Sequence, residues 1–598
     1  MADAWGIDDG YHDVHGQWHD TSDPTRRALR VAQGGLADLA DPPPQARPVW
    51  FVRHGSGPPI QRPAELDLED GTVLHARDAL PPDLPLGYHD LHPDDGGPTT
   101  RLIVVPDRCH LPEGLRTWAW TVQLYSARSR HSWGMGDLGD LRRLATWSRE
   151  LGAGFIGVNP MHAALPLERQ EPSPYFPSSR RYRNPLYLRL EDVPGWDPAD
   201  PELAAAAEAG RTLNDTRIID RDRVHAVKLR ALERLWADFG GDSRFDAYVA
   251  EQGHSLQQYA TFNVLAEHHG IGWRSWPSEH RRPDSLAVER FMTDRARRAR
   301  FHGWLQWLLD EQLARAGGEL AVLGDLAVGV DPDGADGWVW QDVFAPGVRV
   351  GAPPDEFNPD GQDWGLPPFV PWKLRALGYA PWALTVRAAL RHCGALRIDH
   401  VMGLFRLYWL PEGAGPTEGG YVRYPGTELL DIVALESARA GAVIVGEDLG
   451  TVEDEVREEL ARRGVLSYRV AWFEERPPAQ YPKQSLASVT THDLPTIAGV
   501  WSGTDGPAMR DRLVALAGTD DPATPLREVV RRTHARLAEA PSVIVSATLD
   551  DALAVEERPN VPGTTTERPN WSLALPQPIE AIEADLDVAA IAALLERD

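Results

Sequence analysis

The sequence predicts an α/β protein. The expected architecture is a (β/α)8 TIM barrel with a large, mostly helical insertion between strands 2 and 3, preceded by an N-terminal helical segment and a small β-sandwich domain. Eight short apolar runs recur after residue 115, helical stretches separate them, and the chain of 598 residues is long enough for a barrel with added segments. Eight is the number of parallel strands that closes such a barrel.

Two segments are expected before the barrel. Residues 1–42 predict short helices, closed by the Asp-Pro-Pro-Pro sequence at 41–44. Residues 46–113 predict a small β-sandwich, because the apolar runs 49–52 and 101–105 are separated by Gly- and Pro-rich turn sequences. The barrel itself is then expected over residues 115–598.

The eight apolar runs are read as the strands of the barrel. They are residues 118–126, 155–159, 320–330, 395–399, 442–447, 468–473, 487–491 and 543–547. The segment between the second and third runs is far too long for one crossover, and it contains helical stretches at 224–239 and 291–316. We therefore expect a helical insertion at about 161–319.

Composition narrows the classes of function. The formal net charge is −27 at pH 7, which disfavours nucleic acid and anionic membranes as partners. Two cysteines cannot form a disulfide framework. The N-terminus shows no apolar signal segment, and no run reaches the roughly 18 apolar residues of a membrane span. These features favour a cytoplasmic protein.

Carboxylates follow several of the predicted strands. Asp399, Glu447 and Asp493 each lie at or just after the end of an apolar run, and Asp325 lies within the third run; barrel enzymes carry their catalytic groups at such strand ends. Any one of them could instead be an N-cap of the next helix. Four together at the same rim favour catalysis.

The neighbours of these carboxylates fit that reading. Arg397 shares a strand face with Asp399 and would keep that carboxylate ionised, as a nucleophile requires. Glu447 ends an apolar run, where desolvation would raise its pKa toward that of a general acid. His492 precedes Asp493 and could donate to a sugar hydroxyl.

Paired carboxylates without a metal or cofactor motif point to glycosyl chemistry. The histidines lack zinc-ligand spacing, and the loop at 331–337 fails the pattern of a calcium loop. We therefore predict no metal and no cofactor, and we read that loop as a polar βα loop in which Asp336 lines the donor side. A retaining mechanism needs a nucleophile and an acid/base roughly 5–5.5 Å apart.

Several long motifs then resemble a known family, the 4-α-glucanotransferases (amylomaltases or disproportionating enzymes) of glycoside hydrolase family 77 in the α-amylase clan. The motifs run from residue 132 to residue 571 in the expected order. They are 132–140 (SWGMGDLGD), 173–179 (SPYFPSS), 184–187 (NPLY), 324–326 (GDL), 351–355 (GAPPD), 361–365 (GQDWG), 397–400 (RIDH), 446–450 (GEDLG), 491–493 (THD), 560–564 (NVPGT) and 570–571 (NW).

The resemblance implies a role for each matching residue. Asp399 would be the nucleophile, Glu447 the general acid/base, and Asp493 the stabiliser of an oxocarbenium-like transition state. Tyr175 would offer a stacking face near the cleaved bond. The other residues expected to contact substrate are Arg397, His492, Asp325 and Ser173, together with Trp364, Gln362 and Phe357 on a loop over the acceptor sites.

Two positions depart from the family pattern. Leu494 and Pro495 replace the Asn-Asp that follows the Thr-His-Asp motif in shorter members. Glu356 takes the first place of an aromatic pair that often precedes the acceptor-loop motif. The second departure leaves acceptor preference and cyclisation open.

Three functions remain to be separated. The first is a transglycosylase that moves α-1,4-glucan segments between maltooligosaccharides, with glucose as a further acceptor, in a monomer or homodimer. The second is an α-amylase-type hydrolase, which would use the same carboxylates. The third is a non-catalytic glucan-binding protein, which has no need for Asp399, Glu447 and Asp493 together.

Overall fold

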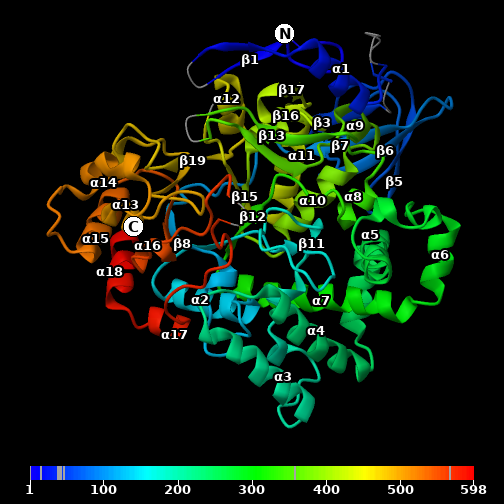
Figure 1. Cartoon of the computed structure of the whole chain (residues 1–598). Coiled ribbons are helices and arrows are strands. Elements are labelled where there is room, and N and C mark those ends of the chain that lie inside the picture. Colours follow the sequence, from blue (N-terminus) through cyan, green and yellow to red (C-terminus); the bar gives the residue numbers. More distant parts are fainter. Residues whose placement is uncertain are drawn as a thin grey trace. The chain divides into compact units, whose positions relative to one another are not determined.

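Eight parallel strands form a closed barrel in the computed structural model of the chain (Figure 1). The structure describes residues 2–13, 16–36, 43–44, 48–355, 358–450, 452–564 and 567–597. The strands follow one another around the barrel in sequence order. They are β8 (Thr117–Val122), β9 (Phe155–Val158), β12 (Val322–Leu326), β15 (Ala395–Ile398), β18 (Val443–Gly446), β19 (Leu466–Val470), β20 (Ser485–Ser488) and β21 (Ile544–Thr548).

All eight predicted runs overlap a barrel strand, so the barrel is confirmed. Strands β9, β12, β18 and β20 are buried at every position, as expected of parallel strands covered on both faces. The sixth strand, β19, begins at Leu466, two residues before the run that predicts it. Such shifts at element ends are ordinary.

Helices connect the barrel strands. Helix α2 begins at a capping box in which the Asp137 carboxylate accepts from the Asp140 amide, and the Asp140 carboxylate accepts from the Asp137 amide. The longer connecting helices are α2 (Leu138–Glu150), α7 (Ala296–Glu319), α10 (Ala380–Leu390), α11 (Gly426–Ala440), α12 (Asp454–Arg462), α15 (Leu526–Leu537) and α18 (Leu586–Leu595). The shorter ones are α8 (Ala335–Val339), α9 (Pro371–Ala376), α13 (Ile497–Ser502), α14 (Arg510–Ala517), α16 (Leu549–Ala552) and α17 (Ile579–Ile582).

The segment between β9 and β12 is mostly helical, as predicted. It carries β10 (His162–Ala163), β11 (Ser179–Arg183), α3 (Pro201–Thr212), α4 (Arg221–Ala237), α5 (Ser243–His269), α6 (Leu286–Thr293) and α7. Helix α7 packs against both α2 and α5. Helix α5 is kinked at Gly253, where φ is +53°, a conformation that glycine adopts without a Cβ penalty.

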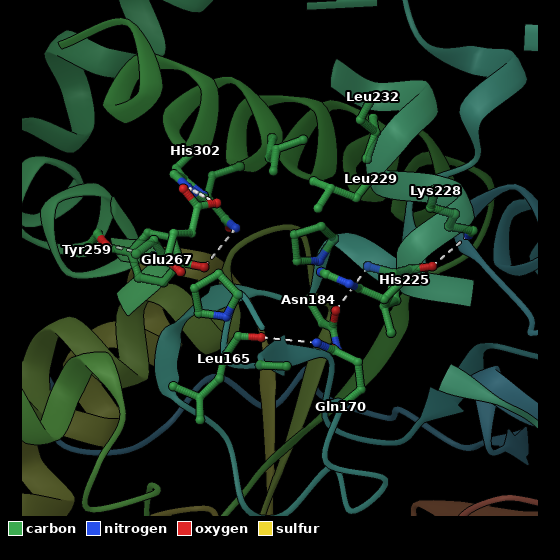
Figure 2. A pocket seen from close by; sticks show the side chains of 17 residues that line it. Leu165, Gln170, Asn184, His225, Lys228, Leu229, Leu232, Tyr259, Glu267 and His302 are labelled. Atoms are coloured by element: carbon green, nitrogen blue, oxygen red, sulfur yellow. Dashed lines mark hydrogen bonds and ion pairs between the residues drawn. The ribbon is translucent and has the colours of Figure 1, made fainter. Parts of the chain in front are cut away.

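A mainly apolar pocket lies within this insertion (Figure 2). Side chains of α4, α5 and α7 line it together with the loops near Leu165 and Asn184. The Lys228 ammonium donates to the carbonyls of Leu186 and Leu188 at 2.7 and 2.8 Å. The predicted catalytic residues lie on other elements.

Contacts within the chain divide it into two compact units. The first unit comprises Met1–Pro112, Trp340–Arg391 and Ile398–Ser467. The second unit comprises Glu113–Val339, His392–Arg397 and Tyr468–Asp598. Among the described residues, no helix has the length and apolar character needed to cross a bilayer.

The N-terminal segment is less helical than the sequence predicts. Its described part forms a hairpin of β1 (Gly10–His12) and β2 (Trp18–Asp20), followed by α1 (Asp23–Ala32). The prediction of a helical segment is therefore correct only for α1. The hairpin forms by pairing between two short polar strands. The sequence pattern of such short polar runs does not reveal this pairing.

The segment predicted as a β-sandwich forms one sheet instead of two. Its strands pair in the order β3-β7-β6-β4-β5. They are β3 (Val49–Arg53), β4 (Ala64–Asp67), β5 (Val73–Ala76), β6 (Gly87–Pro93) and β7 (Thr100–Val105). A sandwich needs two packed sheets. Here β3 pairs in parallel with β7 and so belongs to the same sheet as the other four strands. Among the described residues of this segment, no strand is left to form the second sheet of a sandwich.

The first unit contains a four-stranded sheet that the sequence does not predict. It consists of β13 (Val348–Ala352), β14 (Gln362–Leu366), β16 (Arg406–Pro411) and β17 (Gly420–Arg423). The N-terminal segment packs on it, because Ile7 bridges to Val422 and the Asp8 carboxylate accepts from the Arg423 guanidinium at 2.7 Å. Ile7 and Val422 are fully buried in a shared apolar core.

Candidate active site

Asp325 is the centre of a nearly buried ion pair in the second unit. It belongs to strand β12 and is 9% exposed. Both of its oxygens accept from Nη1 of Arg397, at 2.8 and 2.9 Å, and Oδ2 also accepts from the Tyr175 hydroxyl at 2.6 Å. Charge-assisted bonds of this length hold the three side chains in fixed positions.

His492 and Asp493 form a second pair after strand β20. Nε2 of His492 lies 3.3 Å from Oδ2 of Asp493, and the Asn560 amide donates to Oδ1 at 2.7 Å. Burial disfavours the imidazolium, but Asp493 outweighs burial and raises the pKa of His492. Burial likewise disfavours the carboxylate, but His492 and Asn560 outweigh it and lower the pKa of Asp493. The pair therefore favours charged imidazole beside ionised carboxylate.

Three aromatic side chains, Tyr175, His492 and Trp571, pack together beside these pairs, and we call them the ring cluster. Tyr175 stacks on His492 with 5.0 Å between ring centroids. Trp571 lies 5.3 Å from each of the other two rings. The ring cluster thus joins Asp325, through the Tyr175 hydroxyl, to Asp493, through the His492 imidazole.

Two backbone amides hold the Glu447 carboxylate in the first unit. His400 N–H donates to Oε2 and Leu449 N–H donates to Oε1, both at 2.9 Å. The Glu447 N–H itself donates to the Ile398 carbonyl at 3.0 Å, which ties Glu447 to the end of β15. Both amides stabilise the ionised form of the Glu447 carboxylate. Burial beside the apolar strand β18 has the opposite effect, because desolvation favours the protonated form.

Asp399 directly follows β15 and is half-buried. The next residue, His400, has a left-handed backbone with φ of +47°, which is uncommon for a residue with a Cβ. Burial lowers the pKa of His400, and the Asp399 carboxylate opposes that shift. The imidazole next to Asp399 is therefore neutral at pH 7.

The predicted acceptor loop is a β-hairpin made by β13 and β14. The Trp364 ring meets the His400 ring edge-on, with 5.1 Å between centroids, and its indole N–H donates to the Gln362 side chain at 3.3 Å. The hairpin therefore contacts the residue that follows Asp399 within the same unit. Phe357 lies outside the described residues.

Ser173 shapes the loop that carries Tyr175. Its hydroxyl accepts from the Tyr175 backbone amide at 3.3 Å, and its own amide donates to the Glu171 carboxylate at 3.0 Å. Ser173 is half-buried. The structure thus places Ser173 behind Tyr175, where it supports the loop.

Asp336 does not fit its predicted contact with substrate. It is 3% exposed, and its carboxylate accepts from the Ser179 hydroxyl at 2.8 Å and the Arg180 amide at 2.9 Å. Arg181, also buried, donates to it at 3.0 Å. These bonds occupy both oxygens, so Asp336 anchors strand β11 and the prediction of a donor-side contact is wrong.

The motif at 132–140 is structural as well. Asp137 and Asp140, which cap helix α2, both accept from the Arg189 guanidinium, at 2.8 and 2.7 Å. The Asp140 carboxylate also accepts from the Ser132 hydroxyl at 2.6 Å. The motif fixes the start of α2 to the loop that follows β11.

Three residues beside the site have no predicted role. Asn560 and Trp571 belong to motifs that carry the family resemblance, so the sequence contained a signal for them. Arg221 carried no such signal. Its guanidinium donates to the Trp571 carbonyl at 2.5 Å, across a sequence separation that no local pattern spans.

Comparisons with known proteins agree on one family. The model of glycoside hydrolase family 77, described as 4-alpha-glucanotransferase, matches residues 122–578. A "4-alpha-glucanotransferase" of Mycobacterium tuberculosis is 42% identical over 580 residues, with 86% of this chain and 79% of that protein covered. One of Haemophilus influenzae is 34% identical, with 84% and 82% covered.

A solved structure is similar over the whole chain. The amylomaltase of Corynebacterium glutamicum superposes with a TM-score of 0.87 at 32% identity, and the match covers 100% of this chain and 99% of that one. The similarity includes the barrel and the segments added to it.

Proposed function

We propose that the chain, which belongs to the 4-alpha-glucanotransferase family, is a retaining transglycosylase acting on α-1,4-glucans. It moves a glucan segment from a donor maltooligosaccharide to the 4-hydroxyl of another glucan or of glucose. The observation that carries the proposal is the fixed Glu447 carboxylate, bound to the amide of His400 at the end of the strand that presents Asp399. Two carboxylates of this kind are what retention requires.

In the first step the Asp399 carboxylate attacks the anomeric carbon of the donor. The glycosidic bond breaks, Glu447 gives its proton to the departing oxygen, and the reducing-end fragment leaves. In the second step Glu447 removes the proton from the 4-hydroxyl of the acceptor. That oxygen attacks the anomeric carbon, the ester to Asp399 breaks, and both carboxylates return to their first state.

The family resemblance assigns the charged groups of the second unit to sugar binding. Asp493 is ionised at neutral pH, because His492 and Asn560 outweigh burial and lower its pKa, so it can accept from sugar hydroxyls and face positive charge in the transition state. Arg397 and Asp325 are already paired and therefore rigid, so they lose little conformational entropy when substrate binds.

Transfer also requires that a sugar outcompete water as acceptor. The β13–β14 hairpin carries Trp364 against His400, next to Asp399, and it offers the aromatic face on which an acceptor sugar would stack. A bound acceptor there excludes water from the ester.

We further propose that the enzyme is cytoplasmic and acts as a monomer or homodimer.

The test is incubation with maltotriose alone, followed by separation of the products and a reducing-end assay. We expect glucose, maltopentaose and longer chains with no net gain of reducing ends. A hydrolase would yield only shorter chains with rising reducing ends.

Asp399→Asn and Glu447→Gln should abolish product formation and still bind maltooligosaccharides, whereas full activity in either variant would refute the assignment.

A further inference from the structure

We propose that Trp571 and Arg221 are positioning residues of the active site, and that through them the helical insertion fixes the placement of Tyr175 and His492. The inference rests on the proposed function, since the groups being placed are the partners of Asp325 and Asp493. Neither Trp571 nor Arg221 needs to contact substrate. All four residues belong to the second unit.

The first observation is the backbone of Trp571. Its φ is +59°, in the left-handed region that bulky residues rarely occupy. Such a conformation costs free energy and persists only where the surroundings enforce it, and it is enriched at functional sites. Trp571 is 6% exposed, and its ring packs at 5.3 Å against both Tyr175 and His492.

The second observation is what enforces this conformation. The Trp571 N–H donates to the Pro559 carbonyl at 2.8 Å, and the Trp571 carbonyl accepts from Arg221 at 2.5 Å. The next residue, Ser572, accepts at its carbonyl from the Ile219 amide at 2.8 Å. The backbone around Trp571 is therefore held from both sides.

Arg221 is itself an unusual anchor. It is the first residue of α4, in the insertion, and it is only 8% exposed. Its guanidinium lies 4.8 Å from the centre of the Tyr125 ring, and burial lowers its pKa. A buried guanidinium that contacts a carbonyl and an aromatic face has one stable position, because moving it would leave its donors without partners.

The consequence reaches the carboxylates. The Tyr175 hydroxyl donates to Asp325 at 2.6 Å, and His492 lies 3.3 Å from Asp493. If the Trp571 ring is removed, Tyr175 and His492 each lose the ring that packs against them at 5.3 Å. A shift of about 1 Å at catalytic groups can cost on the order of a hundredfold in rate. The loss should fall mainly on kcat, since a misplaced group fails to stabilise the transition state.

The experiment compares Trp571→Ala, Trp571→Gly and Trp571→Phe in maltotriose disproportionation. Both variants without a ring should lose at least about tenfold in kcat, with KM changed less than about threefold. Trp571→Phe should recover most of the rate. Because glycine accepts a positive φ, Trp571→Gly should have a higher Tm than Trp571→Ala and yet be equally slow.

Two matched controls separate positioning from stability. Trp147→Ala removes an indole that stacks on Trp120 in the same unit, away from the ring cluster. Arg128→Met removes another buried arginine, which donates to the Thr216 carbonyl of the insertion at 2.8 Å, and it is the control for Arg221→Met. Only the Trp571 and Arg221 variants should lose kcat after each has been shown to be folded.

The inference is overturned if Trp571→Gly retains the wild-type kcat, if Trp571→Phe is no faster than Trp571→Ala, or if Arg221→Met behaves like Arg128→Met. A crystal structure of Trp571→Gly gives a readout that does not depend on activity. It should show the Tyr175–Asp325 or His492–Asp493 contact broken, and retention of both refutes the inference. A wild-type enzyme inactive on maltotriose would instead refute the proposed function.

Discussion

The buried carboxyl of Asp551 should make the stability of the fold depend on pH. Asp551 is 1% exposed; its Oδ1 accepts from the Ile497 amide at 2.7 Å, and within the described part of the chain its Oδ2 has no hydrogen-bond partner. Burial raises its pKa to about 7. A carboxyl with a raised pKa stabilises the fold most below its unfolded pKa of about 3.9, and that contribution is lost as the pH rises toward 7.

We therefore expect Asp551→Asn to be more stable than the wild type at pH 8, by on the order of 1–3 kcal/mol, with the difference vanishing near pH 4. Urea unfolding at several pH values measures this. Asp520→Asn, at an exposed position, is the control and should show no such trend. An equal pH dependence in Asp551→Asn and wild type would contradict the assignment.

Asp336 provides a second prediction at the scale of a residue. Its carboxylate pairs with the buried Arg181, so Asp336→Asn leaves that guanidinium without its counter-charge. We expect a loss of about 3 kcal/mol in the free energy of unfolding. At a temperature where the variant is folded, KM for maltotriose should change less than twofold. A large rise in KM without loss of stability would restore the donor-side role that we reject.

At the scale of elements, the β13–β14 hairpin should decide between transfer and hydrolysis. Trp364→Ala removes the ring that meets His400, and we expect hydrolysis to rise at least about threefold relative to transfer. Counting reducing ends against total glucose released measures the ratio. Asp363→Ala is the matched control, because Asp363 points to the other strand face and pairs with Arg349 at 2.8 Å. Equal ratios in both variants would contradict the role of the hairpin.

The N-terminal segment should stabilise the four-stranded sheet. Ile7 is fully buried against Val422 and its neighbours, so Ile7→Ala should cost about 2–4 kcal/mol locally. Hydrogen exchange should show faster exchange in β16 and β17, with little change in strands β8 and β9. Val31→Ala, at an exposed position of α1, should leave exchange unaltered. Uniform exchange in all three proteins would mean that the segment does not support the sheet.

Elements differed in how well the sequence predicted them, and the difference has a physical basis. The eight barrel strands are short, buried apolar runs, and this local pattern can be recognised in the sequence without knowing which strands pair. The four-stranded sheet depends on pairing between distant segments, as at Val350 and Trp409, and the β1–β2 hairpin depends on pairing between short polar segments. The single sheet at β3–β7 was taken for a sandwich because strand runs alone do not say which strands pair.

The site shows the same division at the scale of the whole molecule. Asp325, Arg397, Tyr175, His492 and Asp493 were identified from motifs, and the second unit brings them together. The amides that hold Glu447 and the Arg221–Trp571 contact were not predicted, because a backbone donor or a long-range carbonyl contact leaves no residue signature. Asp336 was misassigned because exposure of a polar loop residue cannot be read from its type alone.

In the proposed mechanism a glucan is carried on Asp399 as an ester. The most direct measurement is to trap that ester with a 5-fluoro α-glucosyl fluoride, digest with trypsin and analyse the peptides by mass spectrometry. Asp399, Glu447 and Asp493 fall on three different tryptic peptides, and Asp399 lies on residues 398–406. We expect one added fluoroglucosyl group on that peptide, and none in Asp399→Asn. A label on either of the other two peptides, or turnover with no label, would contradict it.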